Sequence, residues 1–354
     1  MKAAKPSVEL DGKFGEGGGS IIRTALTMSS LTSIPVVIRN CRGGLRKRGL
    51  NSMDLALTQI FAESTQASFL AEVGDENLAF SPHRRMEGVR TKTDLKSFAK
   101  RAQPGSAVLL AQSLLVPFAR GGMISKFDIS GGTHVPYSPT YDYFRYVTLP
   151  ALARTGVFAA PSIESAAYSS RGTGEISIEI EPSALEPFNF SEPGVPRSVR
   201  CCIVTSELSE SVGKRALTHV ESLSRRDGIK IKSEFVKLRS AEPGAAVAFG
   251  AALDHGFGGA QAFGEKGKRM EEVVEEAYYA FVFWLNSGAG VDEYLADQLV
   301  IPGVLSGKPC SFTTSRITKT LQTTAWVIKQ FMPAKITILG SEGEPGEVRI
   351  NADL

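Results

Sequence analysis

The chain has 354 residues, of which 42% are hydrophobic and 22% are charged, a composition that excludes a disordered protein and predicts a folded one. This length accommodates one main body with an insert. Forty basic residues against 37 acidic ones leave a formal net charge of +3. No global field therefore attracts nucleic acid, and any such contact must be local.

The cysteines at positions 41, 201, 202 and 310 form no Cys-x-x-Cys pair, which is typical of buried thiols in a reducing cytosol. The first residues lack an apolar signal core, and the longest apolar run, residues 107–119, contains Gln112, Ser113 and Pro117. We therefore expect a cytoplasmic protein that is neither exported nor inserted in a membrane.

A pattern of helix, strand, loop and helix occurs twice in the first half of the chain. Residues 19–25 return in similar form as residues 105–111, and each copy places a serine, Ser20 or Ser106, where it would cap the amino end of an apolar helix. A β-type run follows each copy, at 36–39 and 127–130, and then a Gly-Gly loop and another helical stretch.

Later segments predict a third unit and an insert. Helical stretches at 270–286 and 291–305 suggest the third unit, and the prolines in residues 181–196 mark the start of the insert. The insert reads as strand 199–205, helix 208–225, strand 229–236 and strand 245–251. The predicted fold is α/β (α+β): three repeated helix/sheet units in a large domain, residues 1–185 and 260–354, with a small insert domain, residues 186–259.

Two local motifs favour contact with anions. The glycine-rich run at residues 15–20 lies between a short strand and a helix start, where amides and the helix dipole can hold a phosphate; the alternative is a tight connection. Residues 42–48 carry four cations beside two glycines, and the alternative here is a solvated loop.

Four blocks of the sequence, taken in order, resemble the RNA 3′-terminal phosphate cyclase family. They are residues 11–25 (DGKFGEGGGSIIRTA), 131–143 (GGTHVPYSPTYDY), 262–273 (AFGEKGKRMEEV) and 293–299 (EYLADQL). The resemblance implies an ATP-dependent, ligase-type conversion of an RNA 3′-phosphate into a 2′,3′-cyclic phosphate. It also implies Mg²⁺ or Mn²⁺ as a cofactor and RNA 3′ ends as partners.

Carried over by position, the resemblance implies the residues that would bind nucleotide and phosphate. They are Glu16, Gly17, Gly18, Gly19, Arg23, Arg42, Gln112 and Asp297. Glu16 and Asp297 would also hold the metal. Without the resemblance, Asp297 reads as an acid on a helix surface or at a helix cap.

The sequence departs from the family at the residue that should carry AMP, because Thr320 stands where the family has a histidine. No histidine follows His255. Three replacements are open: Lys319 as a lysine nucleophile, His134 approaching from another unit, and Thr320 itself, which would need an activating base.

Two main readings follow from this. The chain is either an ATP-using enzyme of RNA ends with an altered or lost nucleophile, or a non-catalytic RNA-binding or ribosome-biogenesis factor of the cyclase-like type, with a ribonucleoprotein partner. A more distant reading is an enolpyruvyl-transferase-like enzyme, against which the glycine-rich opening argues.

Overall fold

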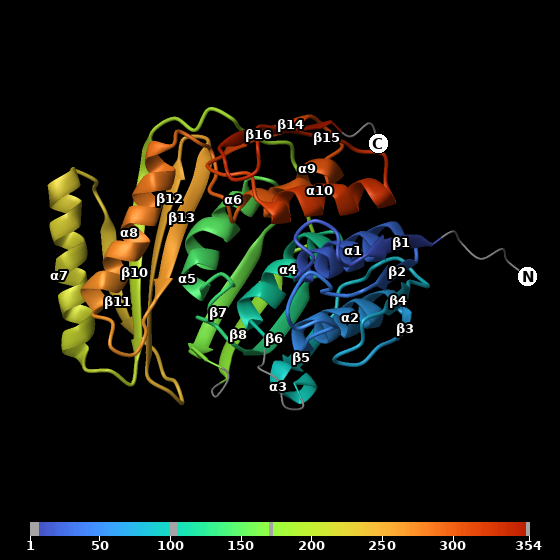
Figure 1. Cartoon of the computed structure of the whole chain (residues 1–354), viewed down its shortest axis with the longest axis horizontal. Coiled ribbons are helices and arrows are strands. Elements are labelled where there is room, and N and C mark those ends of the chain that lie inside the picture. Colours follow the sequence, from blue (N-terminus) through green and yellow to red (C-terminus); the bar gives the residue numbers. More distant parts are fainter. Residues whose placement is uncertain (1–6, 100–104, 170–172, 352–354) are drawn as a thin grey trace, which may run out of the picture.

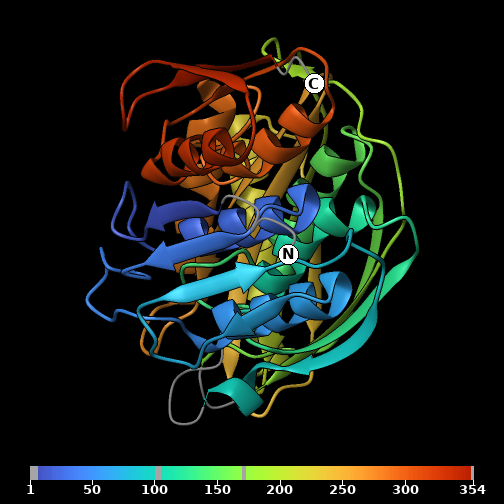
Figure 2. The ribbon, with the colours of Figure 1, turned by 90° about the vertical axis from the view of Figure 1, so that its right-hand side faces the viewer.

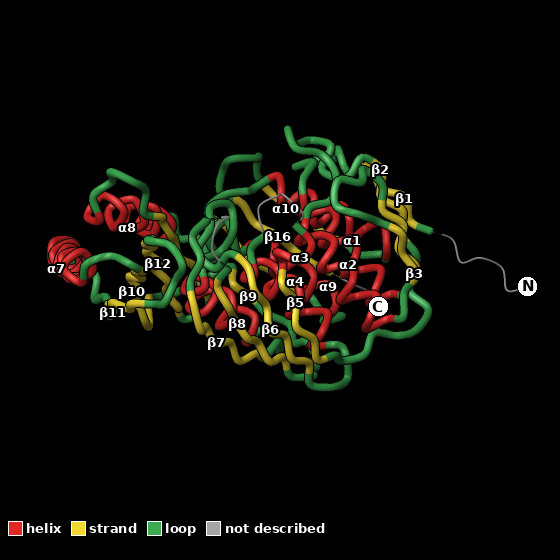
Figure 3. Tube along the Cα trace, turned by 90° about the horizontal axis from the view of Figure 1, so that it is seen from below, coloured by secondary structure: helices red, strands yellow, loops and turns green. Residues whose placement is uncertain are grey.

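The computed structural model describes residues 7–99, 105–169 and 173–351, and within them the strands form four sheets of four strands each. Helices fill the interior of the larger body and sheets lie around them, as the view from below shows (Figure 3). The insert stands to one side (Figure 1). This arrangement confirms the predicted mixed α and β fold.

The first unit has the sheet order β1-β2-β4-β3, in which β1 and β2 are parallel and the other pairs are antiparallel. Helix α1 is almost entirely buried, so both its sides face protein. The elements are β1 (Val8–Asp11), α1 (Gly19–Thr32), β2 (Val36–Arg39), α2 (Ser52–Thr65), β3 (Ser68–Leu70) and β4 (Leu78–Ser81).

The second unit repeats this topology with the order β5-β6-β8-β7, again with only the first pair parallel. Ser106 caps α4 as predicted, since its side chain accepts a hydrogen bond from the Leu109 N–H at 3.1 Å. The elements are β5 (Arg90–Asp94), α3 (Leu95–Phe98), α4 (Ala107–Ala119), β6 (Ser125–Gly131), α5 (Tyr141–Tyr143), the π-helix η1 (Phe144–Thr148), α6 (Leu149–Ala153), β7 (Ala159–Ser165) and β8 (Gly174–Ile180).

The third unit has the same topology, but its chain is split. Strand β9 pairs in parallel with β14, although more than a hundred residues separate them, and the sheet order is β15-β16-β14-β9. The elements are β9 (Asn189–Phe190), the 3₁₀ helix η2 (Ala296–Leu299), α9 (Val300–Leu305), β14 (Cys310–Thr314), α10 (Lys319–Phe331), β15 (Lys335–Leu339) and β16 (Gly346–Asn351). The insert therefore enters between the first strand and the first helix of this unit.

The insert has its own sheet, β11-β10-β12-β13, and its own hydrophobic core, which includes residues from Val199 to Trp284. Its elements are β10 (Pro196–Ser206), α7 (Glu210–Asp227), β11 (Lys232–Lys237), β12 (Gly244–Leu253), β13 (Gly256–Phe263) and α8 (Met270–Asn286). The helix at 270–286 thus packs with the insert and not with the third unit, because Val273, Ala277 and Phe281 bury their side chains in this core.

The predicted division into domains at residues 186 and 260 stays a prediction about independent folding. In the structure β13 crosses residue 260 and pairs along its length with β12. The side view places the insert's strands behind the helices of the larger body (Figure 2).

No helix of the described residues is long and apolar enough to cross a bilayer. The four cysteines are buried and free.

Candidate functional site

The glycine-rich turn after β1 is pressed against α10. Phe14 stacks on Trp326 with ring centroids 3.9 Å apart, and this tryptophan lies half-buried under the turn. Gly15 and Gly17 have left-handed backbones, with φ of +58° and +60°. A β-carbon at Gly15 would lie 2.1 Å from the Thr323 hydroxyl oxygen, so glycine is required there by conformation and by space.

Glu16 ties this turn to two helices. Its backbone N–H donates to the Thr323 hydroxyl oxygen at 3.0 Å, and its carboxylate accepts from the Ser20 N–H at 2.7 Å. Helix α1 begins at Gly19, so Ser20 lies inside it and does not cap it as expected. A carboxylate already occupies one amide at the positive end of the helix dipole, so a phosphate there needs additional cations.

Two arginines supply those cations. Arg23 lies one turn into α1, and Arg42 follows β2 with a left-handed backbone, φ +55°. A β-carbon at Gly19 would lie 2.7 Å from a terminal guanidinium nitrogen of each. The structure therefore brings Arg23 and Arg42 together over Gly19, and a side chain at this position would displace their guanidinium groups.

A buried carboxylate binds the guanidinium group of Arg42. Asp54, whose side chain is fully buried, accepts from the Arg42 Nε at 2.7 Å and from the Asn51 N–H at 3.0 Å through the same oxygen. It also completes a capping box with Asn51 at the start of α2. The other Asp54 oxygen is buried without a hydrogen-bond partner among the described residues. Because Asp54 binds Nε, the outer nitrogens of Arg42 stay available.

The charges in this region oppose one another. Burial lowers the pKa of Arg23. Burial acts in the same direction on Arg42, but the neighbouring Asp54 and Glu16 outweigh it, so the Arg42 pKa lies above its ordinary value. Burial raises the pKa of Asp297 to about 7, against the opposing effect of Arg23. Arg42 therefore remains a cation, whereas Asp297 changes charge near neutral pH.

A small polar cavity lies between α1, α4, η2 and α10. Its lining includes Arg23, Gln112 and Asp297, and Thr324 from α10. The hydroxyl oxygen of Ser20, which also lines the cavity, is buried without a hydrogen-bond partner among the described residues. An unpaired buried hydroxyl beside a cation is what a bound polar group would satisfy.

Thr320 lies at the start of α10, one turn before Thr324, and is not among the residues that line the cavity. It is the second residue of the helix, half-buried, and follows the capping residue Thr318, which accepts from the Leu321 N–H at 3.1 Å. One turn later Thr323 contacts the glycine-rich turn and Thr324 reaches the cavity.

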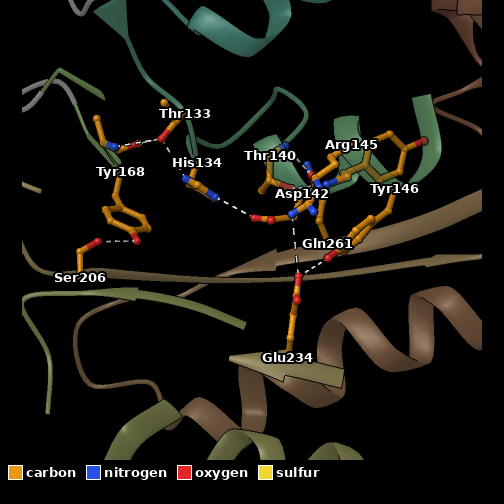
Figure 4. Close-up of polar contacts among 12 residues, drawn as sticks. Thr133, His134, Thr140, Asp142, Arg145, Tyr146, Tyr168, Ser206, Glu234 and Gln261 are labelled. Atoms are coloured by element: carbon orange, nitrogen blue, oxygen red, sulfur yellow. Dashed lines mark hydrogen bonds and ion pairs between the residues drawn. The ribbon is translucent and has the colours of Figure 1, made fainter. Parts of the chain in front are cut away.

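Two of the three candidate replacement nucleophiles, Lys319 and His134, lie outside the cavity lining. Lys319 is exposed, with its amine 3.7 Å from the Glu342 carboxylate. His134 is buried: one ring nitrogen lies 2.9 Å from the Thr133 hydroxyl and the other 3.0 Å from the Asp142 carboxylate (Figure 4). Neither residue is among the described ones that line the cavity.

The site fits a divalent metal only together with a ligand. No group of three or more His, Cys, Asp or Glu side chains gathers to hold a metal in the part of the chain that the structure describes. Glu16 and Asp297 are close enough for the Glu16 charge to raise the Asp297 pKa. Two carboxylates with substrate phosphates and water form a set that suits Mg²⁺. Arg23 and Arg42 bring two guanidinium groups together over Gly19, an arrangement that suits paired phosphate oxygens.

Sequence reasoning missed Asp54 and Thr323. The spacing of Asn51 and Asp54 is a readable capping signal, but nothing in it shows that the carboxylate also binds Arg42. No local signal marks Thr323, because its contact with Glu16 joins positions 307 residues apart.

The fold and site together define a protein of repeated α/β units with paired arginines at a helix start. The family model of RNA 3′-terminal phosphate cyclase matches residues 14–338, and this chain belongs to that family.

Relatives named RNA 3′-terminal phosphate cyclase match nearly the whole chain. The protein of Methylococcus capsulatus is 34% identical over 349 residues, 98% of this chain and 97% of its own. That of Methanopyrus kandleri is 32% identical over 98% of this chain and 99% of its own, and that of a Nostoc species is 30% identical over 95% and 97%. The solved enolpyruvyl transferase NikO from Streptomyces tendae covers 48% of this chain and 32% of its own at TM-score 0.26 and 10% identity, too slight a likeness to carry an argument.

Proposed function

We propose that this protein uses ATP to convert an RNA 3′-phosphate into a 2′,3′-cyclic phosphate, and that Arg23 and Arg42 bind the 3′-phosphate of the RNA. The convergence of the two guanidinium groups over Gly19 carries this proposal. Because Asp54 binds the Nε of Arg42, the two outer guanidinium nitrogens can bind a pair of oxygens, which is the geometry that suits a phosphate monoester.

We infer that the nucleophile is altered, because the resemblance places Thr320 at the position of the family's histidine. Lys319 faces Glu342, and His134 has partners at both ring nitrogens, so neither supports a relocated enzyme nucleophile. We propose that an oxygen of the RNA 3′-phosphate attacks the α-phosphorus of ATP directly and pyrophosphate leaves. The 2′-hydroxyl then attacks the RNA phosphorus, AMP leaves, and the hydroxyl proton passes to solvent.

A glutamate and an aspartate would support both displacements. Glu16 and Asp297, with Mg²⁺ or Mn²⁺, would offset the charge on the phosphates that Arg23 and Arg42 hold. Asp297, with a pKa of about 7, can also exchange a proton near neutral pH.

The test incubates the protein with ATP labelled at the α-phosphate, a divalent metal and RNA ending in a 3′-phosphate. Direct transfer predicts cyclised RNA and free AMP, with no label on the denatured protein. Label that remains on the parent protein and disappears in Lys319→Ala or Thr320→Ala would show an enzyme nucleophile instead. His134→Gln tests the third candidate nucleophile in the same way, because glutamine fills a volume similar to that of histidine.

A second function, a non-catalytic RNA-binding or ribonucleoprotein-assembly factor, is favoured by the same placement of Lys319 and His134 away from the cavity. It predicts that the folded protein binds RNA with a 3′-phosphate but forms neither cyclic product nor AMP, with or without EDTA.

A further inference from the structure

A basic notch lies on the insert, where β10 and β11 begin and α7 ends. Four cations line it: Arg197 and Arg200 from β10, Lys230 just before β11, and Lys232 at the start of β11. None of its lining residues also lines the cavity beside Arg23.

The strand register creates this concentration of charge. Because β10 and β11 are parallel, Arg200 lies directly beside Lys232, and side chains of register partners project from the same face. Two like charges side by side on a sheet are destabilising. A conflict of this kind in a folded protein is typical of a functional surface.

Little negative charge compensates the notch. Arg197 is paired with Asp254, but Arg200, Lys230 and Lys232 are exposed and have no carboxylate partner among the described residues. No carboxylate lines the notch. The carboxyl end of α7 contributes about half a negative charge, which is small against three full cations.

The adjacent aromatic ring is not open for base stacking. Arg145 and Arg200 both lie against the Tyr146 ring, at 5.3 and 5.7 Å from its centroid. The Tyr146 hydroxyl donates to Glu234, which lies on β11 beside it (Figure 4). The notch therefore offers contacts for phosphates and none for base faces.

We propose that this notch binds the phosphate backbone of single-stranded RNA upstream of the 3′ end, without regard to base sequence. The choice of RNA over other polyanions rests on the proposed function. Binding through phosphates predicts an affinity that falls with salt, by about 0.7 logarithmic units per contact for each tenfold rise in salt. Three unpaired cations then contribute a slope of about −2.

The experiment measures fluorescence anisotropy of a labelled RNA of about 15 nucleotides that ends in a 3′-hydroxyl. Such RNA cannot be cyclised, so failure of the proposed catalysis leaves this readout intact. The double variant Lys230→Ala, Lys232→Ala is compared with Lys237→Ala, an exposed lysine at the far end of the same strand. A glutamine pair at 230 and 232 repeats the test with longer side chains.

The double variants should reduce the salt slope by about 1.4 and weaken binding at low salt about tenfold, while Lys237→Ala binds like the parent. Their unfolding temperature should not fall, because a like-charge pair has been removed. Unchanged slope and affinity would overturn the proposal, as would an equal loss in Lys237→Ala or a parent protein that does not bind this RNA.

Discussion

The hydroxyl of Tyr143 lies 2.9 and 2.8 Å from the two carboxylate oxygens of Asp292 and donates to them across 149 residues of sequence. The same buried carboxylate accepts from the backbone N–H groups of Gly259, Tyr294 and Leu295 at 2.8 to 2.9 Å. Asp292 thereby joins the second unit, the insert and the third unit at one point.

Tyr143→Phe should lower the free energy of unfolding by about 1.5–3 kcal/mol, the worth of a hydrogen bond to a charged group. Asp292→Ala should cost more, because it leaves three buried N–H groups unpaired. Urea denaturation measures both. Tyr294→Phe, at an exposed ring, should change the free energy little; an equal loss there would contradict the role of Asp292.

Arg42→Ala should remove most of the preference for a 3′-phosphate over a 3′-hydroxyl, because a charge-assisted pair at this site is lost. The measurement compares the affinities of two RNAs that differ only in that group. Arg46→Ala is the matched control, since Arg46 is exposed in the same loop. A preference that survives in Arg42→Ala would place the phosphate elsewhere.

Gly15→Ala should destabilise the protein more than Gly228→Ala. Both glycines have left-handed backbones, with φ of +58° and +68°, so both substitutions carry a similar conformational cost of about 1–2 kcal/mol. Only at Gly15 does the added carbon meet another atom, the Thr323 hydroxyl oxygen at 2.1 Å, whereas nothing lies within 4 Å at Gly228. Thermal unfolding of the two variants separates these effects, and equal losses would mean that α10 does not press on the turn.

The free energy of unfolding should fall as the pH rises, because Asp297 loses its proton. Burial raises its folded-state pKa from 3.8 to about 7, so its protonated form stabilises the folded state below 3.8 and this contribution is lost as the pH rises to about 7. Asp297→Asn should remove this dependence. Unfolding by urea between about pH 5 and about pH 8 tests it; parallel curves for parent and variant would contradict the raised pKa.

Local sequence determined the repeated units, the glycine-rich turn and the cap at Ser106, because each depends on residues within a few positions of one another. The candidate arginines came from the resemblance to the family, since Arg23 and Arg42 were carried over by position.

Only the tertiary structure decided which helix belongs to which core. The split of the third unit by the insert brings β9 to β14 and gives α8 to the insert, and no local pattern encodes either pairing. The partners of Arg42 and Lys319 were decided likewise by which segments meet after folding.

The basic notch shows the same limit. Arg200 and Lys232 are ordinary surface residues in the sequence, and they become neighbours only through the parallel register of β10 and β11. Periodicity specifies which face a side chain occupies, but charge density depends on which strands pair, and that is set by packing across the whole insert.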